Sequence, residues 1–503
     1  MCVCVSCYCQ HEIIAPLLDI INASISQARV PDMMKITLVY PKYKKGDPQN
    51  LSNYRPISIL PTLSKYLEKA IAKQLIDYIE SNTLFTPSQH GFRKEKSINS
   101  ALIQLCNTIT NHWEDKLHTS AVFLDLQKAF DSLNRKILIS KLIDFKISHK
   151  ALKWFISYLT NRHQAVEITY TKNSYELKSR SNLQNTLQGI PQGSVLGPLL
   201  FLIYINSFPQ LLSQEKICIM FADDTTILSP LKPLSDIQET VEDTLDQATN
   251  FCNSLNLKIN KDKTVHIKFT SSSNSDNPNN NSNLTIASES TTKFLGITID
   301  EKLSWIPHIE QLCSKLATTL FALRRIRNLT NKETTVIAYH ALFASHIKFG
   351  IAAWGAAGET HLQKLLILQK KALRIIEQVP PWESCRELYK SNKILTIVSQ
   401  YILDTIIINK QNKIGLPFRS ECHKYSIRNN LNLNIPYHRL AKTDKTPIIM
   451  GAKLFNLLPI QLKSLYNNNL FNKKLKKYFL EKPYYSLNEF LDEHKQYANL
   501  KLK

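Results

Sequence analysis

The sequence predicts an α+β fold. Segments with the length and apolar pattern of β-strands alternate with amphipathic helices up to about residue 300, and helical patterns dominate from His308 onward. The chain has 503 residues, of which 43% are hydrophobic, so it is long enough for a sizeable core and for two to four domains. We expect a first part that contains β-sheet and a second part that is mainly helical.

Along the first part, each predicted element follows from its periodicity. Apolar residues at helical spacing predict helices, and short alternating or continuous apolar runs predict strands. The predicted elements are a helix at 13–26, a strand leading into a basic turn within 33–47, a helix at 64–82, a strand ending at Asp125 that passes into a helix, a helix at 148–161, and paired strands at 164–170 and 175–183.

The next segments continue this alternation. After "LQGIPQGSVLGP" we expect an apolar helix that runs to about Ser207, then a β-hairpin around Asp223, a polar helix at 235–255 and strands at 263–270 and 291–300. The serine- and asparagine-rich segment 271–283 cannot pack and is expected to be a flexible loop between those two strands. Helices are predicted at 309–326, 332–355 and 360–376, and periodicity weakens in the last hundred residues.

Positive charge is the main compositional signal. The 63 Lys and Arg residues outnumber the 41 Asp and Glu residues, which gives a formal net charge of +22. Basic residues recur among aromatic ones, as in "YPKYKKGD" and "FNKKLKKYFLEKPYY", and do not form a single tail. A basic protein can simply be soluble, but this pattern favours nucleic acid as the partner.

Cysteine usage gives no sign of a disulfide framework. Six of the ten cysteines are scattered singly, and the other four crowd into "MCVCVSCYC" as Cys2, Cys4, Cys7 and Cys9. This cluster is either a zinc site or an irregular terminus, and the spacing leaves both open. The sequence has no signal-peptide pattern, and its longest apolar run, "VLGPLLFLIYI", is too short to span a bilayer. We expect an intracellular protein without a membrane segment.

The stretch "MFADDTTIL" places two adjacent carboxylates, Asp223 and Asp224, inside an apolar run. The segment predicts a buried β-hairpin with the pair at its tip. Two bare carboxylates there would repel each other and resist desolvation, and a divalent cation such as Mg²⁺ would relieve both effects. The alternative is an ordinary solvated turn, in which Asp pairs are common.

Asp125 supplies a third carboxylate. It ends the apolar strand "AVFLD", and a strand of the same sheet would bring it beside the hairpin. Carboxylates in this arrangement hold two metal ions in phosphoryl transfer, where one ion lowers the pKa of the attacking hydroxyl and the other holds the triphosphate. The three residues therefore predict a two-metal site for Mg²⁺, with Mn²⁺ as an alternative ion.

The order of motifs between residues 36 and 300 resembles the reverse transcriptase domain of non-long-terminal-repeat (LINE-type) retrotransposons, in particular the jockey-like mobile elements. The matching stretches are, in order, "VYPKYKKGDPQNLSNYRPISILPTLSKYLEK", "QHGFRKEKS", "FLDLQKAFDSLNR", "GIPQGSVLGPLLFLIYIN", "FADDT", "LNLKINKDKT" and "FLGITID". The helical "YHALFASHIKFGIAAWG" and "LQKKALRII" resemble the thumb-side region of the same elements. The resemblance implies a right-hand polymerase with fingers, a palm built on an antiparallel sheet, and a helical thumb.

The resemblance also implies a role for each matching residue. Asp125, Asp223 and Asp224 would hold the catalytic metals, with Asp223 as the stricter ligand. Lys263, in "NKDKT", matches a lysine proposed to protonate the leaving pyrophosphate, although it is as readily a surface lysine.

Five further residues match the nucleotide-binding positions of the family. Lys42 and Arg55 match fingers residues that meet the triphosphate, although Lys44 and Lys45 compete with Lys42 for that place. Phe130 falls at the gate against the ribose 2′-hydroxyl and is equally compatible with a core position. Gln192 matches the residue that lines the incoming nucleotide, and Gly193 would let the backbone approach the substrate closely.

These matches lead us to expect an RNA-directed DNA polymerase that uses an RNA template, a DNA primer or target and deoxynucleoside triphosphates. The expected divisions are partial fingers at 1–117, palm at 118–305, helical thumb at 306–400 and a basic C-terminal region of unknown role at 401–503. We expect a nuclear or cytoplasmic ribonucleoprotein, and a truncated copy that lacks the upstream endonuclease domain of such elements.

Other interpretations remain open from the sequence. One is a catalytically inactive nucleic-acid-binding remnant, although Asp125, Gln192, Asp223 and Asp224 are all retained. Another is a related palm polymerase, such as a group II intron maturase or a viral RNA polymerase. The "FADD" stretch differs from the "GDD" usual in viral RNA polymerases, and the thumb-side likeness disfavours both.

Overall fold

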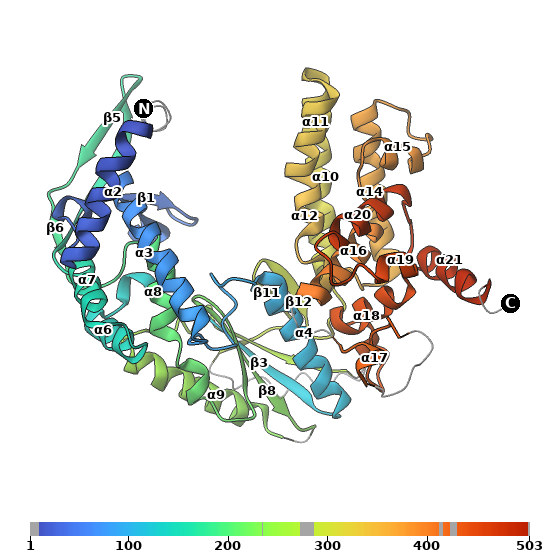
Figure 1. Ribbon diagram of the computed structural model, residues 1–503, viewed down its shortest axis with the longest axis horizontal. Coiled ribbons are helices and arrows are strands. Elements are labelled where there is room, and N and C mark those ends of the chain that lie inside the picture. Colours follow the sequence, from blue (N-terminus) through green and yellow to red (C-terminus); the bar gives the residue numbers. More distant parts are fainter. Residues whose placement is uncertain (1–9, 234, 272–285, 412–415, 423–429, 501–503) are drawn as a thin grey trace.

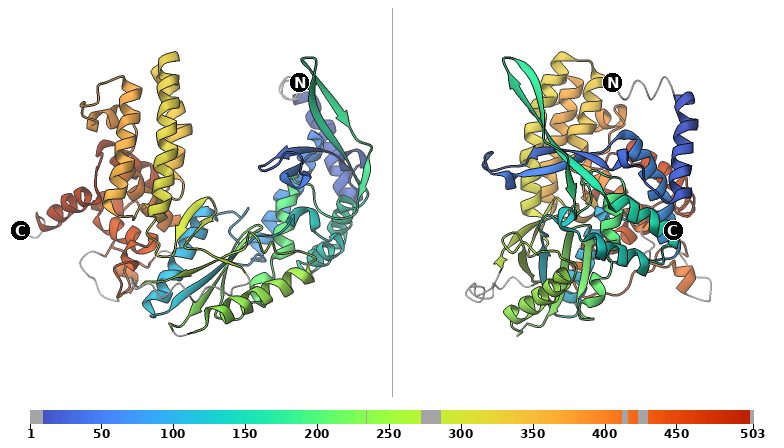
Figure 2. Two further views of the ribbon diagram at one scale, coloured as in Figure 1. Left: turned by 180° about the vertical axis from the view of Figure 1, so that it is seen from behind. Right: turned by 90° about the vertical axis from the view of Figure 1, so that its left-hand side faces the viewer.

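A computed structural model describes residues 10–233, 235–271, 286–411, 416–422 and 430–500 of the chain. In Figure 1 two arms rise from a common base. The left arm carries the N-terminal helices together with strands β1, β4, β5 and β6, and the right arm is entirely helical. Figure 2 shows the same division from behind. The predicted α+β character is confirmed, and the Cys2–Cys9 cluster and almost all of the 271–283 segment lie outside the described residues.

The base is a five-stranded sheet of order β10-β9-β3-β8-β7. Its strands are β3 (His118–Leu124), β7 (Ile217–Phe221), β8 (Asp224–Leu231), β9 (Val265–Phe269) and β10 (Ala287–Ser288). β3 pairs antiparallel with β8 on one side and with β9 on the other. The strand before Asp125 is therefore central, and the expected hairpin is β7 and β8.

Both faces of this sheet are covered, because successive side chains of a strand point to opposite faces. Ala121 and Phe123 of β3 join one core cluster with residues of helix α4 (Ile98–Glu114). Val122 and Leu124 join a second cluster with residues of α8 (Leu196–Ile205) and α9 (Ile237–Ser254). Burial on both faces explains why the strand reads as a continuous apolar run.

The left arm contains a second five-stranded sheet, in which β2-β1-β4-β5 are neighbours and β6 pairs with β4. β1 runs antiparallel to β2 and parallel to β4. The strands are β1 (Ile36–Tyr43), β2 (Tyr54–Ile59), β4 (Arg162–Lys172), β5 (Tyr175–Arg180) and β6 (Gln184–Thr186). The helices of this arm are α2 (Gln10–Gln27), α3 (Thr62–Ser81), α5 (Ala129–Ser132), α6 (Arg135–Asp144) and α7 (His149–Leu159).

The right arm is built on α10 and α14, which pack against each other (Figure 1). Its first helices are α10 (Ile306–Leu329), α11 (Lys332–Ala338), the π-helical turn η5 (Tyr339–Ala344), α12 (Ser345–Lys348), α13 (Ile351–Trp354) and α14 (Glu359–Glu377). The later helices are α15 (Arg386–Ser391), α16 (Ile397–Gln411), α17 (Arg419–Cys422), α18 (Pro447–Leu457), α19 (Ile460–Lys463), α20 (Phe471–Glu481) and α21 (Leu487–Leu500). Residues of α16, α18 and α20 share one core cluster with α4 and α10, so the basic C-terminal region packs onto the rest of the chain.

Three element predictions are wrong in detail. Residues 291–300 form a hairpin, β11 (Thr291–Phe294) and β12 (Ile297–Asp300), because Leu295 and Gly296 both have positive φ and reverse the chain. The helix expected at 332–355 is divided by the π-helical turn η5 and again at Gly350, whose φ is 68°. Most of the other helices and strands named from the sequence up to residue 376 are confirmed, but the helix expected after Asp125 is divided into α5 and α6, and α4, β2, β6 and β10 were not predicted.

A core substitution tests the importance of the central sheet. Leu228 of β8 is fully buried, so Leu228→Ala is expected to lower the free energy of unfolding by about 2–5 kcal/mol. Urea denaturation would measure the change, and Leu187→Ala, at a residue that is 84% exposed, is the control with little expected effect. Equal losses in the two variants would contradict the central role of β8.

Candidate active site

The β7–β8 hairpin presents two adjacent carboxylates at one end of the central sheet. The turn consists of Ala222, with φ of 57°, and Asp223, and Asp224 opens β8 opposite Phe221. The pair therefore lies at the tip of a hairpin between two strands of the sheet, as the sequence predicts. Asp223 is half-buried and Asp224 is exposed.

Asp125 lies at the same end of the sheet. It directly follows β3, and Leu124, the last residue of that strand, is paired with Thr225 of β8. This register places Asp125 beside Asp224. Asn260 holds it there, because the Asn260 side-chain amide donates to Asp125 Oδ2 at 3.1 Å and its backbone N–H donates to the Asp125 carbonyl at 2.8 Å. We call Asp125, Asp223 and Asp224 the carboxylate site.

The protein environment raises the pKa values of Asp223 and Asp224. Exclusion of water by the surrounding protein raises the pKa of Asp224 to about 6, and the charges of Asp223 and Asp125 add to this effect. Burial is also the main reason why the pKa of Asp223 is raised, and Asp125 raises it further, while Arg55 lowers it. The site therefore concentrates negative charge in a place where water only partly screens it.

Lysines and an arginine surround these carboxylates. The Nζ of Lys263 is 3.6 Å from Asp125 Oδ2. Lys42 of β1 pairs across the ladder with Arg55 of β2, so these two side chains lie on the same face of the sheet. Burial lowers the pKa of Lys44, and the charges of Arg55 and Lys263 lower it further, whereas Asp125 raises it. Lys44 therefore lies within electrostatic reach of the carboxylate site.

The loop that carries Gln192 is held by hydrogen bonds on two sides, to Asp131 and to Ser58. The Gln192 side-chain amide donates to Asp131 Oδ2 at 2.9 Å, and the Ser58 N–H of β2 donates to the Gln192 carbonyl at 2.8 Å. At Gly193, φ is 128°, and an added Cβ would lie 2.5 Å from the Ser58 carbonyl oxygen. Both the backbone angle and this close approach require glycine.

Phe130 lies just beyond Asp125 in the chain. Its ring stacks on Phe201 of α8, with ring centroids 4.8 Å apart, and its carbonyl accepts from the Ile190 N–H at 2.9 Å. The residue is half-buried. Phe130 therefore makes a core contact through its ring and holds Ile190 of the neighbouring loop through its carbonyl, and its role as a gate stays a prediction.

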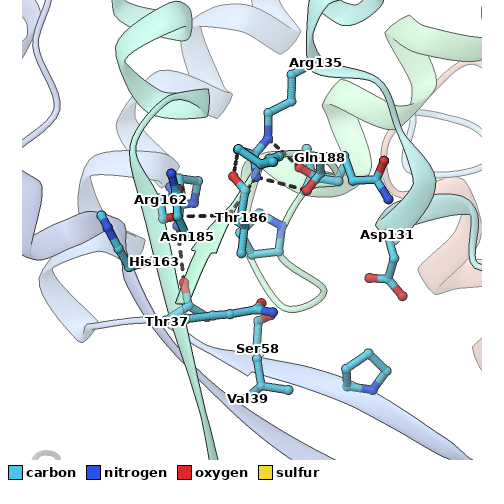
Figure 3. Close-up of a pocket in the computed structure, with 16 residues that line it drawn as sticks. Thr37, Val39, Ser58, Asp131, Arg135, Arg162, His163, Asn185, Thr186 and Gln188 are labelled. Atoms are coloured by element: carbon cyan, nitrogen blue, oxygen red, sulfur yellow. Dashed lines mark hydrogen bonds between the residues drawn. The ribbon is translucent and has the colours of Figure 1, made fainter. Parts of the chain in front are cut away.

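A cavity of about 310 Å³ lies behind the Gln192 loop, with Ser58 and Asp131 in its wall (Figure 3). Two arginines of its wall hold the surrounding backbone. Arg135 donates to the carbonyls of Thr186, Gln188 and Gly189, and the buried Arg162 donates to the Tyr158 carbonyl. The sequence analysis did not identify Asp131 or Arg135, because each acts through a partner more than fifty residues away.

Another residue that the sequence analysis missed is Gln89, which braces the carboxylate hairpin from behind. Gln89 is almost fully buried, and its Oε1 accepts from the N–H groups of Gly91 at 2.8 Å and Ala222 at 3.1 Å. The chain around it pairs with β7, because the Met220 N–H donates to Ser88 and its carbonyl accepts from His90. An added Cβ at Gly91 would lie 2.7 Å from the Ala222 nitrogen. The signal in the sequence that could have identified Gln89 was the stretch "QHGFR", one of the matches to the reverse transcriptase motifs.

A divalent cation suits this donor set. Within the described ranges, no group of three or more His, Cys, Asp or Glu side chains is arranged so that it could hold a metal ion. Mg²⁺ usually binds to one or two carboxylates and completes its shell with water and substrate phosphates, so a complete protein cage is not required. A bound cation would also offset the burial and the neighbouring negative charge that together raise the pKa values of Asp223 and Asp224.

Comparison with known families identifies the class of protein. Residues 42–299, a little over half of the chain, match the reverse transcriptase (RNA-dependent DNA polymerase) family, and the chain belongs to it. This range includes all three carboxylates and the motifs around them. The fold class predicted from the sequence, an α+β right-hand polymerase, is thereby confirmed.

The relatives in this family come from mobile elements. The chain is 25% identical over 86% of its length to a probable RNA-directed DNA polymerase from transposon X-element, and 26% identical over 75% to the RNA-directed DNA polymerase from mobile element jockey, both of Drosophila melanogaster. These alignments cover 47% and 41% of the relatives, so the chain spans less than half the length of each. The resemblance to jockey-like, LINE-type reverse transcriptases is confirmed.

A solved telomerase from Candida tropicalis, in complex with a fragment of telomeric RNA, overlaps 77% of this chain and 64% of its own, with 13% identity and a TM-score of 0.38. Because this overlap is loose, the family assignment rests on the sequence comparisons. Separately, none of the helices in the described part of the chain is both long enough and apolar enough to cross a membrane.

The brace behind the hairpin can be tested with Gln89→Met. This change keeps the length of the side chain but removes the acceptor shared by Gly91 and Ala222, so we expect faster amide hydrogen exchange in the β7–β8 turn. Mass spectrometry of the peptide that contains Ala222 would measure it. Gln210→Met, at an exposed glutamine, is the control, and unchanged exchange in Gln89→Met would contradict the brace.

The raised pKa of Asp224 predicts a pH-dependent stability. The pKa is about 6 in the folded chain and about 3.9 in an unfolded one, so the folded state binds more protons between these values and stability falls as pH rises through them. Asp224→Asn should therefore stabilise the chain at pH 7, on the order of 1 kcal/mol after allowance for solvent screening of an exposed carboxylate.

At pH 4 the stabilisation by Asp224→Asn should shrink towards zero, because Asp224 is then protonated in the folded chain. Urea denaturation at the two pH values would measure the difference. Asp246→Asn, at an exposed carboxylate of α9, is the control for the loss of a surface charge. A stabilisation of equal size at pH 4 and pH 7 would argue against the electrostatic cause.

Proposed function

We propose that this chain is an RNA-directed DNA polymerase that extends a DNA 3′-hydroxyl on an RNA template. The observation that carries the proposal is the convergence of Asp125, Asp223 and Asp224 at one end of the central sheet, in a chain of the reverse transcriptase family. The proposal concerns the chain as printed, which spans less than half the length of the relatives compared above.

The three carboxylates would hold two Mg²⁺ ions, with Mn²⁺ as an alternative. When bound, such ions lower the pKa of an attacking hydroxyl and neutralise the triphosphate and the leaving pyrophosphate. The protein's own part is to hold the carboxylates in place. Asn260 orients Asp125, and the Gln89 contact fixes the turn that carries Asp223.

The residues around the carboxylates would bind the deoxynucleoside triphosphate. Arg55 is suited to bidentate contact with its phosphates, and Lys42 of the adjoining strand β1 and Lys44, just after that strand, would add positive charge. Lys263, beside Asp125, would donate a proton to the leaving pyrophosphate.

The sugar and base of the incoming nucleotide would lie against the remaining residues. Gln192 and Gly193 would line the nucleotide, in a loop that Asp131 and Ser58 hold in place. Phe130, whose ring stacks on Phe201, would exclude a ribose 2′-hydroxyl.

The template and primer would follow the basic surface of the chain, whose formal net charge is +22. We propose fingers at 1–117, palm at 118–305, thumb at 306–400 and an additional basic region at 401–503. Binding through backbone phosphates would weaken steeply with salt. A chain that binds RNA in this way would reside in a nuclear or cytoplasmic ribonucleoprotein.

Primer extension tests the proposal. On poly(rA)/oligo(dT) with Mg²⁺ or Mn²⁺, Asp223→Asn should reduce extension by roughly a thousandfold or more, because it removes the charge that holds the metal. Asp246→Asn, at an exposed carboxylate remote in sequence from the hairpin, should leave extension unchanged. RNA binding without any extension by the unmodified chain would instead favour the inactive binding remnant.

A further inference from the structure

A second cavity, of about 380 Å³, lies where α4, the β12–α10 turn, the α13–α14 loop and the start of α18 meet. These elements are neighbours at the foot of the right arm (Figure 1). The cavity wall is largely apolar, and three lysines from two separate segments stand around it. We call it the lysine-rimmed cavity, and its rim is Lys302, Lys442 and Lys445.

The cavity lies far from the carboxylate site. Its wall includes Trp113, just before β3, whose indole N–H donates to the Phe269 carbonyl at 3.4 Å. Phe269 pairs with Thr119 at the beginning of β3, whereas Asp125 follows the end of the same strand. The strand has seven residues, which at about 3.3 Å per residue separate the two places by roughly 20 Å.

The wall has room for a flat apolar group. The lining includes three small residues, Ala353, Ala356 and Ala357, and two tryptophans, Trp113 and Trp305. A volume of this size is within the range of small-molecule sites, about 300–1,000 Å³. An apolar wall with convergent polar groups is also their usual composition.

Positive charge is concentrated at the rim. Lys442 lies over the Trp113 ring, with its Nζ 4.6 Å from the ring centroid. Burial lowers the pKa of Lys442, and the charges of Lys302 and Lys445 lower it further, so both of these ammonium groups lie within electrostatic reach of Lys442. Lys302 and Lys445 are exposed.

Nearby carboxylates offset part of this charge. Asp300, which raises the pKa of Lys442, accepts hydrogen bonds from the backbone N–H groups of Lys302, Ser304 and Trp305. Glu301 lies 3.9 Å from the Lys302 ammonium, a long and exposed contact of little strength. His361 also lines the cavity, and its buried Nδ1 has no hydrogen-bond partner among the described residues.

We propose that the lysine-rimmed cavity binds one nucleotide of a single-stranded RNA, with the base against the apolar wall and the phosphate at Lys302, Lys442 and Lys445. A nucleotide combines a flat apolar body with an anion, which is the pairing that this cavity offers. His361 would supply a hydrogen bond to the base or the sugar. The site would anchor RNA away from the carboxylate site, and it does not depend on polymerase activity.

Site-specific cross-linking tests this proposal. The intact chain would be irradiated with a short oligouridylate that carries 4-thiouridine, and cross-linked peptides would be mapped by mass spectrometry. We expect cross-links in peptides that contain Trp305 or His361. Their absence, when cross-links form elsewhere on the chain, would overturn the proposal.

Two variants separate the charge from the apolar wall. Lys302→Gln with Lys445→Gln should reduce these cross-links roughly tenfold, because two charge-assisted contacts are lost. The matched control is Lys473→Gln with Lys474→Gln, two exposed lysines of α20, which should leave them unchanged. Ala357→Phe, which fills the cavity and leaves the charge intact, should also abolish them.

Two further measurements identify the ligand and distinguish this binding site from the proposed polymerase activity. Labelling by 4-thiouridine monophosphate but not by the oligomer would overturn the assignment to RNA. The Asp223→Asn variant should cross-link like the unmodified chain, so a failure of the polymerase proposal would leave this result intact. Equal loss of cross-links in the cavity variants and in the Lys473 and Lys474 control would mean non-specific attraction and would also overturn the proposal.

Discussion

The antiparallel pairing of β3 with β8 is the constraint on which the rest of the structure depends. It places Asp125, at the end of one strand, beside Asp224, at the start of the other, and the turn before β8 adds Asp223. Burial, together with the charge of neighbouring carboxylates, raises the pKa values of Asp223 and Asp224, and keeping these groups ionised opposes folding. The apolar burial on both faces of the sheet offsets this cost, and α4, α8 and α9 supply that burial.

Much of the surrounding structure serves to hold these charges in place. Asn260 holds Asp125, Gln89 fixes the backbone of the hairpin turn, and Asp131 orients Gln192. These residues can contribute to the site without contacting a substrate. Each fixes a side chain or a turn that would otherwise have several conformations, which is how a site is made ready before its ligands arrive.

The same sheet also separates two places of opposite character. The carboxylate site lies at one end of β3, and the lysine-rimmed cavity lies near the other end, beside Trp113 and Phe269. One concentrates negative charge that suits a metal ion, and the other concentrates positive charge that suits a phosphate. A polymer that reached both would be held at two points along the base of the molecule.

The sequence by itself determined the carboxylate hairpin, the strand before Asp125, the order of the reverse transcriptase motifs and most helices up to residue 376. These features depend on local periodicity and on short stretches of neighbouring residues, which are visible without a fold. Only the tertiary structure decided that residues 291–300 fold back at Leu295 and Gly296, that Gln89 reaches Ala222, and that Lys44 lies near Asp125. The lysine-rimmed cavity was equally hidden, because its wall combines segments that are more than three hundred residues apart. Contacts between distant segments depend on how whole elements pack, and no local pattern records them.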